Sequence, residues 1–291
     1  TVAVALAVST LALPVAAWAG SPAPGASAAL RTCAAPADVP DTTMAAGLPP
    51  AGASPAPADS PRAAATELTV FGAASLRGAF ETFAPALQAD TGIVPRYSFD
   101  ASSALRAQIE QGAPADVFAS ADTSNVVALL EAGQAVSPVA FACNQLTVIV
   151  PAGNPARLTS ALDLGRPGVR VIAAGDEVPI TRYAVQLVDR LGIADAYAAN
   201  VASREDNVAA VRAKIELGEG DAGVVYVTDA IASGARVEQV PVPPDANVPA
   251  TYAAAIVGDT GQPEESAAFL AWLTGPAGQA SLAAFGFLPA P

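Results

Sequence analysis

Short apolar runs alternate with segments of helical periodicity from about residue 66 onward. Runs such as Glu67–Phe71 (ELTVF) and Leu146–Val150 (LTVIV) have the length of a buried strand and are too short for a core helix. Between such runs, apolar residues recur at helical spacing, as in Ser75–Leu87. This alternation is typical of an α/β fold in which most strands are parallel.

The same pattern predicts most of the remaining elements. Further strands are expected at 95–99, 116–119, 169–173, 223–227 and 251–257. Helices are expected to begin at Ser102 or Ser103, at Thr123, at Pro179 and after the segment 203–206, which resembles a capping box. Two closing helices are expected around Phe269, Trp272 and Phe285.

The order of these elements predicts two α/β lobes. We expect residues 66–145 plus 250–291 to form lobe 1 and residues 146–249 to form lobe 2, because the late strand returns to the first lobe. The chain would then cross between the lobes twice, near residues 142–147 and 247–252, and these crossings would form a hinge.

The N-terminal quarter differs in composition. Residues 1–19 are apolar and uncharged and end in Ala17-Trp18-Ala19, which is typical of part of a secretory signal peptide. A membrane anchor is the alternative, although Pro14 and the short length disfavour it. Residues 20–65 are rich in Pro and Ala without apolar periodicity and predict a disordered linker. We therefore expect an exported protein, periplasmic or tethered at the cell surface outside the cytoplasmic membrane.

The two cysteines, Cys33 and Cys143, leave three alternatives open. Export makes a single disulfide between them chemically feasible. Cys33 could instead carry a lipid, although Arg31 stands where small residues are expected before a lipid-attachment cysteine. Free thiols are the third alternative.

Composition and charge exclude several classes of function. The chain has 291 residues, 52% of them hydrophobic and only 14% charged, so it can bury a full core. Its formal net charge of -13 provides no basic surface for nucleic acid or anionic lipid. It contains no histidine, which excludes a Ser-His-Asp hydrolase, and two cysteines are too few for a closed structural zinc site.

An anion could still be bound by helix N-termini. Candidate termini with small or hydroxyl residues begin near Ser75, Ser102, Ile180 and Asn207. Each terminus carries roughly half a positive charge, so four that converged would offset a dianion without any lysine or arginine.

Several motifs occur in the order and spacing of one known family. They are LTVFGAASL (68–76), SSALRAQIEQGAPADVF (102–118), GDEVPITRY (175–183), EDNV (205–208), GVVYVTDA (223–230) and WLTGPAGQASLAAFGF (272–287). On these motifs the chain resembles the molybdate-binding proteins of bacterial ABC transporters over about residues 66–291. The resemblance implies a two-lobed, periplasmic-binding-protein-like fold, each lobe a mixed, mainly parallel sheet flanked by helices, with the ligand cleft between the lobes.

The resemblance also implies a function and a site. Ser75 and Ser102 would donate hydroxyl and backbone N–H groups from lobe 1, whereas lobe 2 would add the backbone N–H groups of Ile180 and Asn207 and the hydroxyl of Tyr226. All are neutral donors, which suits a fully ionised dianion. The protein would capture molybdate, and also tungstate, and deliver it to an ABC membrane permease. It would act as a monomer, would not be an enzyme, would need no cofactor, and would bind molybdenum only as the oxyanion, without direct metal ligands.

Some residues depart from the family pattern or carry charge near the cleft. Asp100 precedes the Ser102 helix, where a carboxylate would oppose an anion, so we expect it to point to solvent. Thr181 stands where glycine is frequent in the family. Four arginines occupy first helical turns and are expected to be solvated or paired with nearby acids: Arg77, Arg106, Arg182 and Arg204.

Two other functions are consistent with the sequence. A receptor for another tetrahedral oxyanion is one, with sulfate as the nearest rival, since hydrogen phosphate would need an acceptor for its proton. An exported, carboxylate-dependent hydrolase is the other, using Asp116 with Asp122 or Asp206 with Asp229.

Overall fold

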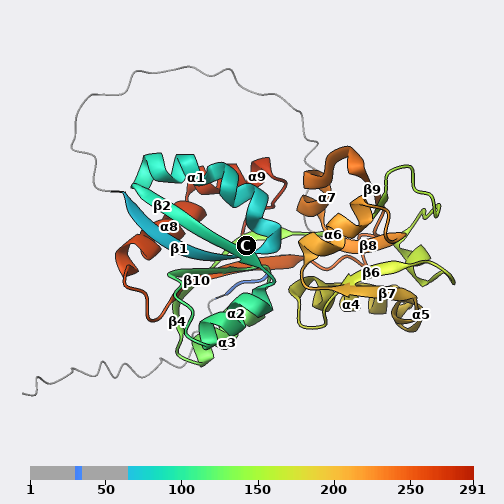
Figure 1. The fold of residues 1–291 in the computed structure, drawn as a ribbon, viewed down its shortest axis with the longest axis horizontal. Coiled ribbons are helices and arrows are strands. Elements are labelled where there is room, and N and C mark those ends of the chain that lie inside the picture. Colours follow the sequence, from blue (N-terminus) through green and yellow to red (C-terminus); the bar gives the residue numbers. More distant parts are fainter. Residues whose placement is uncertain (1–29, 35–64) are drawn as a thin grey trace, which may run out of the picture.

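The computed structural model of the protein describes residues 30–34 and 65–291. The signal peptide expected at residues 1–19 and nearly all of the linker expected at 20–65 lie outside these residues. The described part forms two lobes side by side, each built on a five-stranded sheet with helices against its faces (Figure 1). None of its helices is both long enough and apolar enough to span a membrane.

The first sheet combines the N-terminal strands with a late one, in the order β2-β1-β3-β10-β4. Its strands are β1 (Thr66–Ala73), β2 (Ile93–Asp100), β3 (Val117–Ser120), β4 (Ala135–Asn144) and β10 (Ala250–Val257). Because β10 is antiparallel to both neighbours, β3 and β4, it alone runs against the other four. The helical elements of this lobe are η3 (Ala74–Leu76), α1 (Arg77–Thr91), α2 (Ser102–Glu110), α3 (Ser124–Glu131), α8 (Pro263–Thr274) and α9 (Pro276–Ala284).

The second sheet has the order β7-β6-β8-β5-β9. Its strands are β5 (Leu146–Pro151), β6 (Val171–Ala174), β7 (Val201–Glu205), β8 (Ala222–Tyr226) and β9 (Val237–Val240). Only β5 runs against the other four. Its helical elements are η4 (Ala161–Gly165), α4 (Pro179–Arg190), α5 (Ala194–Asn200), α6 (Val208–Glu216), α7 (Val227–Ser233) and η5 (Gly234–Arg236). Both sheets are thus mixed and mainly parallel, which confirms the predicted fold class.

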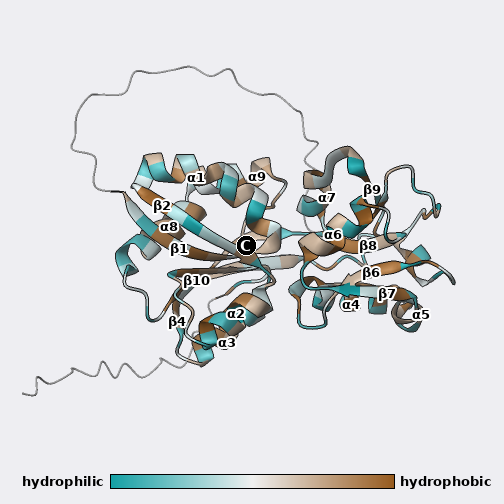
Figure 2. Cartoon of the chain, in the orientation of Figure 1, coloured by the Kyte–Doolittle hydropathy of each residue, from teal (hydrophilic) through white to brown (hydrophobic). Residues whose placement is uncertain are grey.

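The core follows from the apolar central strands. Leu68 and Val70 of β1 and Val148 of β5 are completely buried, because helices cover both faces of their sheets. In Figure 2 hydrophobic and hydrophilic bands alternate along helices such as α2, as expected of helices that bury one side against a sheet. Phe80 of α1 packs in the first lobe against Phe83, with ring centroids 4.8 Å apart.

Both connections between the lobes lie near one disulfide. The chain crosses from β4 to β5 at Gln145 and returns along residues 241–249. Cys33 forms a disulfide with Cys143 at the end of β4, and its backbone N–H donates to the Thr251 hydroxyl at 2.9 Å. Of the three alternatives that the sequence leaves open, the structure therefore contains the disulfide.

The predicted capping box at 203–206 is wrong. Residues Ser203 to Glu205 belong to β7, which pairs in parallel with β6. The N-cap of α6 is Asn207, whose side-chain oxygen accepts a hydrogen bond from the N–H of Ala210 at 3.1 Å. Backbone pairing with β6 therefore outweighs the local capping signal.

Candidate functional site

All five predicted site residues line one small pocket between the lobes. The donors that the structure brings together there are Ser75, Ser102, Ile180, Asn207 and Tyr226. The remaining lining residues are small or apolar with the exception of Asp100, and no lysine or arginine belongs to the lining. The pocket therefore combines neutral donors from both lobes without a cationic side chain.

The first lobe contributes two serines from neighbouring strand ends. Strands β1 and β2 are adjacent and parallel, so the helical segments that follow them begin at the same edge of the sheet. Ser75 lies in η3 after β1, and Ser102 is the first residue of α2. Ser102 is 1% exposed, and its hydroxyl oxygen accepts a hydrogen bond from the N–H of Ala121 at 3.1 Å. This bond occupies the oxygen of Ser102 and leaves its proton free to be donated.

The second lobe contributes two helix N-termini. Helix α4 begins with Pro179, a residue well suited to a first helical position, and no side chain caps this terminus. Ile180 follows directly, so its backbone N–H is one of those that the helix itself does not satisfy. At the start of α6, Asn207 caps the helix through its side chain and is also one of the residues that line the pocket.

Tyr226 ends the buried strand β8 and has an unusual hydroxyl group. The residue is 1% exposed, and its hydroxyl has no hydrogen-bond partner among the described residues. Burial raises the pKa of this phenol well above its usual value, and the nearby Tyr252 adds to the effect. The hydroxyl therefore keeps its proton at physiological pH and is available as a donor.

Asp100 does not point to solvent, and that prediction is wrong. Its carboxylate lines the pocket and accepts hydrogen bonds from the N–H of Ala101 at 2.7 Å and from the side-chain amide of Asn207 at 2.9 Å. The two lobes meet at this bond, because Asp100 belongs to the first lobe and Asn207 to the second. The local sequence around Asp100 does not reveal this donor, which is why the prediction failed. Both bonds engage the same carboxylate oxygen.

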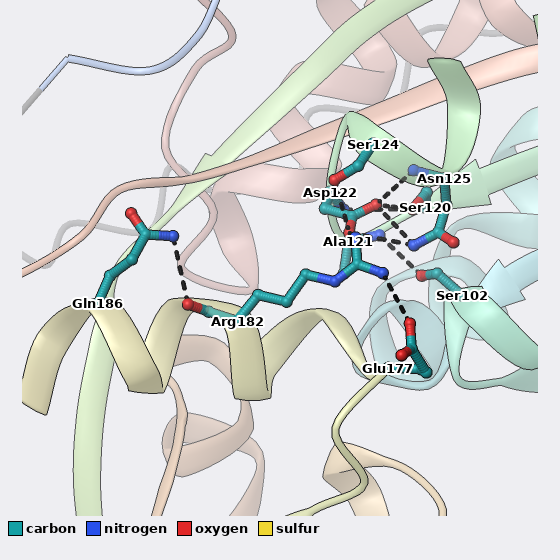
Figure 3. Close-up of polar contacts among 9 residues, drawn as sticks. All are labelled: Ser102, Ser120, Ala121, Asp122, Ser124, Asn125, Glu177, Arg182 and Gln186. Carbon is teal, nitrogen blue, oxygen red and sulfur yellow. Dashed lines mark hydrogen bonds and ion pairs between the residues drawn. The ribbon is translucent and has the colours of Figure 1, made fainter. Parts of the chain in front are cut away.

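The four arginines near the cleft are paired with acids, as predicted. Three form ion pairs with single partners: Arg77 with Glu81, Arg106 with Glu110, and Arg204 with Asp176. Arg182 of α4 reaches between Glu177, at 3.3 Å, and Asp122 of the first lobe, at 3.5 Å (Figure 3). The pocket lining itself therefore contains neutral donors and no arginine.

Thr181 ties the start of α4 to the second sheet. Its hydroxyl donates to the carbonyl oxygen of Ala174 at 3.0 Å, and the side chain is buried. The hydroxyl thus has an internal partner, and Thr181 is not among the residues that line the pocket.

The acids considered for catalysis hold parts of the backbone instead. Asp116 accepts hydrogen bonds from the N–H of Thr69 and the hydroxyl of Thr260. Asp122 accepts from the backbone and side-chain N–H groups of Asn125 (Figure 3). No group of three or more potential metal ligands occurs in the described part of the chain.

One residue beside the pocket was missed from the sequence. Tyr252 lies on β10, is completely buried, and has its hydroxyl oxygen 2.9 Å from that of Ser75. A lone tyrosine within the predicted apolar strand 251–257 was the available signal, since a buried phenol requires a partner.

The chain is similar to known proteins over most of its length. Residues 68–288 match the family described as bacterial extracellular solute-binding protein. The chain is 37% identical over 249 residues to the molybdate-binding protein ModA of Mycobacterium tuberculosis, which covers 84% of this chain and 94% of that protein. The solved periplasmic molybdate-binding protein of Azotobacter vinelandii has a TM-score of 0.66 at 26% identity, covering 76% of this chain and 98% of that one.

A second solved structure supports the fold alone. The sulfate-binding protein SubI of Mycobacterium tuberculosis has a TM-score of 0.71 at 21% identity, covering 77% of this chain and 87% of that one. Two-lobed binding proteins for different oxyanions therefore share this architecture, and the ligand must be argued from the pocket.

Proposed function

The chain belongs to the bacterial extracellular solute-binding proteins, and among them to the molybdate-binding proteins, and we propose that it captures molybdate in the pocket between its lobes. Members of this family are exported binding proteins and not enzymes, and the same holds for this chain. We further propose that it also binds tungstate and delivers either anion to the permease of an ABC importer, from the periplasm or from a tether outside the membrane.

The observation that carries the proposal is the unpartnered hydroxyl of Tyr226. A buried donor without an acceptor costs about 1 to 3 kcal/mol, so it is unfavourable unless a ligand supplies the missing oxygen. This hydroxyl belongs to the lining of the pocket that also contains Ser75 and Ser102. A bound oxyanion would accept hydrogen bonds from all three hydroxyl groups.

The chemistry of the remaining donors supports a dianion. Ile180 and Asn207 lie at helix N-termini, where backbone N–H groups and the helix dipole both favour negative charge. Molybdate offers only acceptor oxygens, which matches a set of five donors. All five donors belong to one chain, which supports the proposal that the protein acts as a monomer. The net charge of -13 argues against a nucleic-acid partner.

Asp100 makes hydrogen phosphate a useful competitor in the test. Its carboxylate lies on the pocket wall and could accept the proton of a monoprotonated anion. One carboxylate oxygen already accepts two hydrogen bonds, from Ala101 and Asn207, which leaves the other oxygen to accept such a proton.

Isothermal titration calorimetry with four anions tests the proposal. We expect molybdate and tungstate to bind with one anion per chain, and molybdate to bind equally well in a large excess of sulfate or hydrogen phosphate. If sulfate or hydrogen phosphate bound more strongly than molybdate, that anion would be the ligand instead of molybdate. If none of the four anions produced heat of binding, the proposed function would be wrong.

A further inference from the structure

Tyr252 lies directly behind the pocket without lining it. Its side chain is completely buried on β10, and its ring packs edge-on against Tyr226 with centroids 5.5 Å apart. Its hydroxyl oxygen lies 2.9 Å from that of Ser75, and either atom could be the donor on distance alone. One buried residue of the returning strand thus contacts one expected ligand donor from each lobe.

The burial of Tyr252 determines the direction of the bond to Ser75. Among the described residues, the Ser75 oxygen is the one hydrogen-bond partner of the Tyr252 hydroxyl, and Tyr252 is completely buried. A buried phenol that donated to no acceptor would cost about 1 to 3 kcal/mol. The Tyr252 proton is therefore donated to the oxygen of Ser75, whose own proton can reach the pocket that Ser75 lines.

The proton of Ser75 is then the one that remains unassigned. If the Ser75 oxygen accepts from Tyr252, its own O–H cannot point back along the same bond. Burial raises the pKa of Tyr252 well above its usual value, so the phenol has a proton to donate throughout the physiological range. Ser75 lines the pocket, and the direction left to its proton is toward a bound anion.

We propose that Tyr252 is a positioning residue for the oxyanion site, which donates its proton to Ser75 and thereby fixes the Ser75 hydroxyl as a donor to the anion. The inference rests on the proposed function. The hydrogen bonds would then run in one direction from Tyr252 through Ser75 to the anion, and bonds aligned in this way polarise and strengthen one another. Tyr252 would therefore raise affinity without touching the ligand.

A double-mutant cycle with molybdate tests this role. Tyr252→Phe keeps the buried ring and removes only the hydroxyl, so the aromatic packing with Tyr226 is retained. We expect Tyr252→Phe to raise the Kd for molybdate about three- to tenfold, the range that corresponds to one hydrogen bond. In a chain that already carries Ser75→Ala, the same change should alter Kd by less than about twofold.

A matched control separates positioning from general stability. Tyr97 of β2 has a buried hydroxyl that, unlike that of Tyr252, has no partner among the described residues, and Tyr97 does not line the pocket. Tyr97→Phe should leave Kd unchanged, and thermal unfolding should show that all variants are folded at the assay temperature.

The outcomes distinguish the inference from the proposed function. Unchanged Kd for Tyr252→Phe in a protein that binds molybdate would overturn the positioning role and leave the function intact. An equal loss in the native and Ser75→Ala chains would also overturn it, because the effect would then not pass through Ser75. A native protein that bound no molybdate would overturn the proposed function, and the inference with it.

Discussion

At the scale of single residues, the pocket contains two serine hydroxyl groups whose oxygens are already engaged in hydrogen bonds. Ser102 accepts from Ala121, and the bond between Ser75 and Tyr252 gives Ser75 the same arrangement. A hydroxyl whose oxygen is occupied in this way has its proton available for a ligand. A negatively charged protein can therefore offer hydroxyl donors to an anion without a lysine or arginine in the pocket, where its own acidic residues would pair with that cation.

Truncation of either serine should weaken molybdate binding. Ser75→Ala and Ser102→Ala each remove one donor to a charged group in a desolvated site, so each should cost about 1 to 3 kcal/mol of binding free energy, measured by calorimetry. Ser103→Ala is the matched control, since Ser103 is adjacent to Ser102 but does not line the pocket. Native affinity in both test variants would show that the ligand is bound elsewhere.

The sequence predicted these donors and missed the surroundings of Asp100. Ser75, Ser102 and Tyr226 lie in motifs read along the chain, and the structure brings them to one pocket. The partner of Asp100, in contrast, is the amide of Asn207 in the other lobe, 107 positions away. Contacts of this kind depend on how the lobes meet, and no local pattern encodes that.

At the scale of elements, the start of α7 fixes the position of Tyr226. The carboxylate of Asp229 accepts a hydrogen bond from the backbone N–H of Tyr226 at 3.3 Å, at the junction of β8 and α7. Asp229 is itself buried, and burial raises its pKa to about 6, although Arg212 and the bond from Tyr226 oppose the rise. The helix start beside the pocket therefore contains a carboxyl group that titrates in a mildly acidic range.

Asp229→Asn should change the pH dependence of stability. The folded state holds the proton of Asp229 more tightly than the unfolded state, where the pKa is near 3.8, so the contribution of this proton is complete below about pH 4 and is lost as pH rises through about 6. Because a rise from 3.8 to about 6 corresponds to on the order of 3 kcal/mol, the variant should gain up to that amount relative to the native protein between pH 4 and pH 7.

Urea unfolding of both proteins at several pH values measures this difference. The other carboxyl groups are common to both proteins, so their titration cancels in the comparison. A difference in unfolding free energy that stayed constant from pH 4 to pH 7 would contradict a raised pKa for Asp229.

At the scale of the whole molecule, the central strands are predictable from the sequence, and the strands that were not predicted lie at sheet edges. The central strands β1, β3, β5, β6, β8 and β10 coincide with short apolar runs in the sequence. The missed strands β4, β7 and β9 are all edge strands, and they lack a continuous apolar run because several of their side chains are exposed or only half-buried. Strand β4 even contains Pro138, a residue that an edge tolerates and a sheet interior does not.

The lobes meet through polar contacts around the pocket. Besides the bond between Asp100 and Asn207, the amide of Asn144 donates to the Thr228 hydroxyl at 2.8 Å across the lobes. We propose that an oxyanion between these lobes is bound by neutral donors of both lobes, in place of lysine or arginine.

A crystal structure of the protein with molybdate, with the anion located by the anomalous scattering of molybdenum, tests that claim most directly. We expect a single anomalous peak in the pocket. The anion oxygens should lie within hydrogen-bonding distance of the hydroxyl groups of Ser75, Ser102 and Tyr226 and of the backbone N–H groups of Ile180 and Asn207. A peak outside this pocket, or an anion held by an arginine or lysine side chain, would contradict the account.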